Sequence, residues 1–315
     1  MRRPVIIASI LALLLACDKP NEADLAPPVP LTDMSTASAV LFQVYGAHDE
    51  PKAAPIAVVV QGELRAIVLD SPGWRTFDST YFKTGARMPI YRDGVDIGAV
   101  EVVRGMWPAN DVPLYSLPAC REVIPQAEVS LQATITPEET VEFLASSVAL
   151  PQAKKAAVPR DATQAGRTVA NAVATGQNVG REELAKLDFI SRWLQTGAGP
   201  SGRTLLASYI DPNAGDAGPG AGHTTMILAL AEDSAGTQSA SYSHVSNGEA
   251  RSVDFQRLAN HADLDGDGVD EIILEQWRYA ATPELLVLKY RAGSWTEAFR
   301  VSLDWCVVKS EAPPR

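Results

Sequence analysis

The sequence predicts an α+β protein with an N-terminal β module at 38–125, a helical middle segment at 126–200 and a C-terminal antiparallel β module at 201–315. Two observations lead to this fold class. Apolar runs rich in β-branched residues, separated by glycine-containing turns, fill the first and last parts of the chain. The part between them has helix-capping residues and apolar residues at helical spacing. No period of twenty to fifty residues repeats, so a repeat architecture is not expected.

The N-terminal segment, MRRPVIIASILALLLACDKP, predicts export. A basic start precedes an apolar run that is shorter than the roughly 20 residues needed to span a bilayer core, which is typical of a cleaved signal peptide. The motif LLAC, ending at Cys17, resembles the lipobox of bacterial lipoproteins. The resemblance implies that residues 1–17 hold a signal peptide with Cys17 as the lipidated residue after cleavage. An ordinary signal peptide with a chance cysteine is the alternative.

The proline-rich residues 18–37 predict an extended tether. Together with an acylated Cys17, this places the protein in the bacterial cell envelope, anchored to a lipid bilayer, with its folded part in the periplasm or at the cell surface. In such an oxidising compartment Cys120 and Cys306 are expected to form a disulfide bond, and two buried free thiols are the alternative.

The charge balance excludes one class of partner. The chain has 27 basic and 38 acidic residues, a formal net charge of -11. This charge argues against nucleic acid and suits cations or basic partners, although solubility alone also explains it.

Within the N-terminal β module, APIAVVVQGELRAIVL predicts two strands around Gly62, and MPIYRDGVDIGAVEVV predicts a hairpin with Asp93-Gly94 in its turn. The segment between them is interpreted as a long loop rich in turn residues and aromatic residues. Its aromatic side chains either plug the core, which we expect, or line a binding groove. They are Trp74, Phe77, Tyr81 and Phe82.

The middle segment has three helix candidates. TPEETVEFLASSVAL begins with Thr136 as N-cap and Glu139 three residues later, a capping box. DATQAGRTVANAVATG is alanine-rich. GREELAKLDFISRWLQTG places apolar residues on one helical stripe. That stripe consists of Leu184, Leu187, Ile190 and Leu194.

The sequence of the C-terminal module predicts a series of strands. TTMILAL is apolar on both faces and is expected at the centre of a sheet. LLVLKYRAGSW predicts a hairpin with Ala292-Gly293 near its turn.

An acidic loop, HADLDGDGVDEIILEQW, precedes one of these strands. Asp263, Asp265 and Asp267 alternate, and Glu271 is the ninth residue counted from Asp263. Calcium takes six to eight oxygen ligands, so several carboxylates on one tight loop predict a calcium site. An EF-hand would need a glutamate at the twelfth position, where this chain has Leu274.

The spacing resembles the D-x-D-G-D-G-x-x-D/E calcium loop of FG-GAP-type repeats, over roughly residues 258–300. The resemblance implies a site in loop 263–271 with four side-chain ligands and one backbone carbonyl, and it leaves Asp270 at a non-ligand position. The ligands are Asp263, Asp265, Asp267 and Glu271, with the carbonyl of Val269. A single copy does not predict a closed propeller. An acidic turn without a metal is the alternative.

The residue patterns favour a non-enzymatic protein. Signatures of a P-loop, a zinc protease or a serine nucleophile elbow are absent from the sequence. A loop that supplies most of the calcium ligands predicts a structural ion. We therefore expect an envelope protein that binds a protein or glycan ligand, or has a structural role. The alternative is a periplasmic metal-dependent hydrolase that uses the acidic loop or a pocket around His223.

Overall fold

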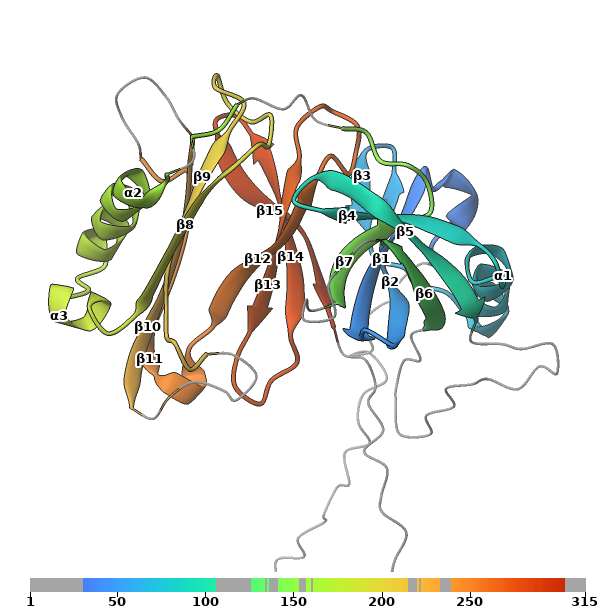
Figure 1. Cartoon of the computed structure of the whole chain (residues 1–315), viewed down its shortest axis with the longest axis horizontal. Helices are drawn as coiled ribbons and strands as arrows, with labels where there is room; N and C mark the ends of the chain where they lie inside the picture. The colour runs from blue at the N-terminus through green and yellow to red at the C-terminus, as the bar shows by residue number, and fades with distance from the viewer. Residues whose placement is uncertain are drawn as a thin grey trace, which may run out of the picture. The chain divides into compact units, whose positions relative to one another are not determined.

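The computed structural model describes residues 31–105, 126–133, 135, 141–152, 157–159, 161–214, 220, 222–232 and 239–303. All of them belong to one compact unit, Leu31–Arg315. They form mainly antiparallel β-sheets, with few helices (Figure 1). The β-rich part of the predicted fold class is confirmed, and the helical middle is much smaller than expected.

The first sheet uses the N-terminal strands. Their bounds are β1 Ala39–Ala47, β2 Glu50–Val60, β3 Glu63–Arg65, β4 Arg87–Arg92, β5 Val95–Arg104, β6 Ala127–Ala133 and β7 Val141–Ser146. The order is β1-β7-β4-β5-β6-β2-β3, and β1 also pairs with β2. Six of these strands therefore pair in a closed circle, which leaves those six without a free edge. The short 3-10 helix η2, Met34–Thr36, precedes β1.

The helix α1, Ser71–Tyr81, lies in the segment that the sequence assigns to a loop. Its N-cap, Asp70, accepts a hydrogen bond from the Gly73 N–H at 2.8 Å. Phe77 and Phe82 are each 2% exposed and pack against Phe42 inside the first sheet. The expected core role of the aromatic cluster is confirmed, and the loop prediction is wrong because a side-chain cap starts a helix there.

The second sheet has the order β11-β10-β9-β8. Its strands are β8 Asp188–Leu194, β9 Thr204–Ile210, β10 His223–Glu232 and β11 Tyr242–Glu249. The helix α2, Thr163–Gly176, packs against this sheet through Val169, Ala170 and Ala174, and it matches the alanine-rich helix of the prediction (Figure 1). The predicted central strand is also confirmed, because β10 is an inner strand and is buried from Thr224 to Ala231.

The third sheet is a meander in the order β12-β13-β14-β15. Its strands are β12 Phe255–Ala262, β13 Glu271–Trp277, β14 Glu284–Arg291 and β15 Ser294–Ser302, and the 3-10 helix η3, Ala250–Ser252, precedes them. Alternate residues pack to opposite sides: Ile273 joins the cluster shared with the first sheet, and Ile272 and Leu274 join the cluster shared with the second. Both faces of the third sheet are therefore buried along its inner strands β13 and β14, whereas the edge strand β15 is mostly exposed.

The three predicted hairpin turns are confirmed. The turn residues Gln61-Gly62, Asp93-Gly94 and Ala292-Gly293 all have positive φ. Two successive residues with positive φ match the twist of the flanking strands, and glycine adopts this conformation without steric cost.

The helix predicted from Thr136 is wrong, because β7 occupies Val141–Ser146. Val141 and Phe143 point into the core of the first sheet, and Leu144 packs toward the third sheet. Burial on both faces of a strand that pairs with β1 and β4 outweighs the local capping signal.

The long helix predicted over residues 180–197 is also wrong. A single turn, α3 Arg181–Leu184, is followed by β8. Ile190, which the helical stripe would bury, is 53% exposed, and Phe189 packs in a cluster with Tyr209 instead. The pairing of β8 with β9 sets the period of this segment to two.

Several predictions fall outside the described residues. These are the signal peptide, lipidation of Cys17, the tether up to residue 30 and the disulfide between Cys120 and Cys306. In the described part of the chain, each helix falls short of the length and apolar character needed to cross a membrane.

Candidate metal centre

The acidic loop joins β12 to β13 at the edge where the third sheet meets the first. The two strands pair up to Ala262 and Glu271, so residues 263–270 form the connection. Ala262 and Leu264 belong to the apolar cluster that also contains Leu41 and Val59. The loop is therefore built into the core on one side, as its apolar flanks suggest.

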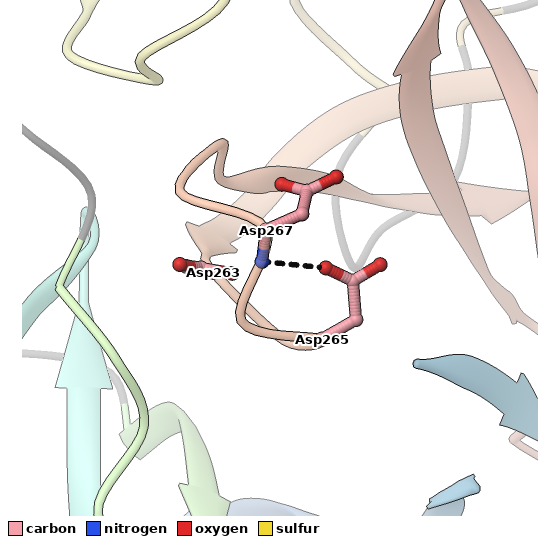
Figure 2. Close-up of side chains that lie close together, drawn as sticks. All are labelled: Asp263, Asp265 and Asp267. Atoms are coloured by element: carbon pink, nitrogen blue, oxygen red, sulfur yellow. Dashed lines mark hydrogen bonds between the residues drawn. The ribbon is translucent and has the colours of Figure 1, made fainter. Parts of the chain in front are cut away.

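Three aspartates converge on this loop. Asp263, Asp265 and Asp267 each offer a carboxylate oxygen, and these oxygens lie within 4.8 Å of one another (Figure 2). A group of this composition could hold a metal ion. The structure thus brings together three of the side chains that the sequence assigns to a cation.

The loop's own backbone holds these carboxylates in place. Asp263 accepts hydrogen bonds from the N–H groups of Gly266 at 2.7 Å and Gly268 at 3.0 Å. Asp265 accepts one from the Asp267 N–H at 3.1 Å (Figure 2). Gly266 and Gly268 have φ of 84° and 88°, which allows the chain to turn tightly around the carboxylates.

Glu271, the fourth predicted side-chain ligand, is buried at the start of β13 and is 2% exposed. Its Oε2 accepts a hydrogen bond from the Leu264 N–H at 2.8 Å. Burial, together with the charges of Asp267 and Asp263, raises the pKa of Glu271 to about 8. Burial likewise raises the pKa of Asp263. Crowded, desolvated carboxylates of this kind favour a nearby cation.

Val269, the predicted carbonyl ligand, donates its N–H to Asp267 Oδ1 at 2.9 Å. The side chain of Val269 packs at the edge of the core between the second and third sheets. The role of its carbonyl as a ligand stays a prediction.

Lys289, on β14, reaches the same carboxylates, and the sequence analysis missed it. Its ammonium forms an ion pair with Asp265 and lies 3.5 Å from Asp267 Oδ2 and 3.9 Å from Glu271 Oε1. Its side chain is only 13% exposed. A lysine inside the apolar strand ELLVLKYR is a signal that could have found it, since lysine is rarely buried without a partner.

Asp270, the predicted non-ligand, has a different partner. Its Oδ2 lies 2.6 Å from His261 Nδ1, and both side chains are almost fully buried. The backbone N–H of Asp270 donates to the Thr196 carbonyl at 2.7 Å. The fifth carboxylate of the loop is therefore directed away to a separate buried pair.

The loop and its flanks also contact the first sheet. Asn260 Nδ2 donates to the Tyr91 carbonyl at 2.7 Å. A side chain added at Gly62 would come within 3.9 Å of Asp265, and one added at Gly266 within 3.7 Å of Pro151. Gly62 in the first sheet's hairpin and Tyr91 on β4 thus lie next to the loop and its flanking strand.

Gly94→Ala provides a test of this packing. Gly94 has φ of 67°, and an added Cβ would lie 2.6 Å from Asp270 Oδ2 and 2.9 Å from His261 Nδ1. Gly293→Ala is a matched control in a similar turn, with φ of 87° and nothing within 4 Å of the added Cβ. Both variants place alanine at a positive φ, so this strain is common to the two. Overpacking occurs only at Gly94, so we expect the free energy of unfolding in urea to fall by about 1–3 kcal/mol more in Gly94→Ala than in Gly293→Ala. Equal losses would show that the hairpin does not pack on the His261–Asp270 pair.

His223, the other residue considered for catalysis, lies at the start of β10. Its side chain is 55% exposed, and its Nε2 is 3.9 Å from Glu183 Oε1. Glu183 is also bonded to Thr225 and Asn247. One cavity between the first and third sheets is lined by residues of β1, β2, β7 and β12–β14, and neither His223 nor the three aspartates are among them.

Comparisons of the chain with family models, with curated proteins and with solved structures give no match.

Proposed function

We propose that the chain is a lipid-anchored protein of the bacterial cell envelope that carries one structural calcium ion and acts as a binding or structural protein, with a protein or a glycan as its partner. The observation that best supports the cation is the convergence of three aspartate oxygens within 4.8 Å on the loop between β12 and β13. The anchor rests on the sequence around Cys17.

The donor set fits calcium better than other metals. The aspartates and Glu271 offer only oxygen, which hard cations prefer, whereas zinc and copper sites favour nitrogen or sulfur. Magnesium demands a small octahedral shell and usually keeps several waters. Several carboxylates crowded on one glycine-containing loop suit the larger and more adaptable shell of calcium.

A structural role follows from where the loop lies. It connects two strands of the third sheet, and Asn260, near the end of the preceding strand β12, donates a hydrogen bond to the Tyr91 carbonyl of the first sheet. A cation held by the loop's own oxygens would fix this connection and offset the repulsion among the carboxylates. A site filled by protein oxygens also leaves little room for a reactive water, so we favour structure over hydrolysis.

Calcium titration of the melting temperature tests the proposal. Binding to the folded protein alone adds about 2.7 kcal/mol of stability at a hundredfold excess of calcium over Kd. We expect the melting temperature to rise with calcium, to fall with chelator and to respond little to magnesium. Asp265→Ala should abolish the calcium response.

Asp49→Ala is the matched control for this experiment, because it removes the same charge from an exposed turn between β1 and β2. It should keep the full calcium response. If the wild-type melting temperature does not change with millimolar calcium after stringent chelation, the loop is an acidic turn without a bound metal and the proposal is wrong.

The anchor is tested separately by intact mass. We expect the mature protein to begin at Cys17 with added acyl chains, and to partition into detergent. Cys17→Ala should give an unprocessed or soluble form. Cleavage at another position without acylation would contradict the anchor and leave the calcium site unaffected.

A further inference from the structure

We propose that the ammonium of Lys289 competes with calcium for the carboxylates of the acidic loop, and that this competition sets the affinity of the loop for calcium. This inference rests on the proposed calcium site. The ammonium forms an ion pair with Asp265 and lies 3.5 Å from Asp267 and 3.9 Å from Glu271. These are three of the four side chains that the sequence assigns to calcium.

The sheet register fixes Lys289 in this position. Ile272 on β13 pairs with Leu288 on β14, so one further step brings Lys289 opposite Glu271. The strand β14 thus places a positive charge next to the predicted calcium ligands, although Lys289 is not part of the loop. The side chain is 13% exposed, so the ammonium is largely removed from water. Its ion pairs with the carboxylates offset the cost of this desolvation.

Competition follows from charge and space. When all four carboxylates are ionised they carry a formal charge of -4, and Lys289 offsets only one of these charges. A calcium ion needs oxygens at about 2.3–2.6 Å, and an ammonium in contact with Asp265 occupies the same lone pairs and repels a divalent cation. Calcium binding therefore requires the ammonium to move toward solvent, and its flexible four-carbon stem permits this.

Replacing Lys289 by a neutral side chain of similar size tests the inference. We expect Lys289→Met to lower the Kd for calcium at least tenfold in isothermal titration of the full chain. Arg291→Met is the matched control: it lies two residues further along β14, pairs with Glu63 at 2.8 Å and is half exposed. It removes the same charge nearby without touching the loop, so its Kd should stay within about twofold of the wild type.

The outcomes separate this inference from the proposed function. Tighter binding by Lys289→Met alone supports both. Binding that is unchanged or weaker in Lys289→Met overturns the competition and leaves the calcium site standing. Binding by Lys289→Met but not by the wild type supports the competition and overturns calcium as the native ligand. Absence of binding in both overturns both.

A measurement on the wild-type chain covers the case in which Lys289→Met does not fold. Saturating calcium should raise the labelling of Lys289 by an amine-reactive reagent several-fold, as read by peptide mass spectrometry. Lys186, which is exposed, should label equally with and without calcium. Unchanged or reduced labelling of Lys289 at saturating calcium would overturn the inference.

Discussion

Asp270→Ala is expected to lower the free energy of unfolding by about 3 kcal/mol, the upper end of the range for leaving a buried hydrogen-bonding group without its partner. The side chains of Asp270 and His261 are 2% and 3% exposed, and the carboxylate lies 2.6 Å from the imidazole. The alanine leaves a buried imidazole nitrogen without its partner, so the desolvation of that nitrogen is no longer compensated. Equilibrium unfolding in urea measures the loss.

Asp254→Ala is the control for this prediction. Asp254 forms two hydrogen bonds with Arg278, at 2.9 and 2.8 Å, but both side chains are solvent-accessible. Exposed pairs contribute about 0–1 kcal/mol, so this variant should lose far less than Asp270→Ala. Since Asp270 is not among the converging aspartates, its variant should keep the calcium-dependent rise from a lower starting temperature. Equal losses in the two variants would refute a special role for the buried pair.

Phe77→Ala is the second large effect, with an expected loss of about 3–5 kcal/mol. Phe77 is 2% exposed and is the centre of the aromatic cluster. Its ring centroid lies 4.8 Å from that of Tyr81, 5.4 Å from Trp74 and 5.6 Å from Phe82. Removing the ring leaves a cavity between α1 and the first sheet, and neighbouring rings cannot fully close it.

Tyr279→Ala controls for the loss of an aromatic ring as such. Tyr279 is 40% exposed and its ring contact is with the guanidinium of Arg251, 4.8 Å from the centroid. An exposed contact of this type contributes about 0.5–1 kcal/mol. If the Phe77 variant were as stable as the Tyr279 variant, the aromatic cluster would not stabilise the core. That result would support the alternative interpretation, in which the cluster lines a binding groove.

The sequence alone determined those features that depend on neighbouring residues. The hairpin turns at Asp93-Gly94 and Ala292-Gly293 are set by the few residues that tolerate positive φ. The convergence of Asp263, Asp265 and Asp267 follows from alternation on a short loop with glycines at two positions. The strands from Thr204 onward were also predictable, because their apolar runs are short and rich in β-branched residues.

Only the tertiary structure decided the middle of the chain. The segments 136–148 and 180–197 have good local helix signals, yet Val141–Ser146 and Asp188–Leu194 are strands. A capping box contributes on the order of 1 kcal/mol, whereas burying both faces of β7 in a closed set of paired strands contributes several. The partners of β7, namely β1 and β4, lie some fifty to one hundred residues earlier in the chain, beyond the reach of a local pattern.

The composition of the candidate site divides in the same way. Its carboxylates lie within nine residues and could be found by spacing. Lys289 joins them only because the register between β13 and β14 places it opposite Glu271, and Asp270 leaves them only because His261 is buried beside it. Local spacing brings like charges together; the long-range register, which depends on burying both faces of the third sheet, decides which charges offset them.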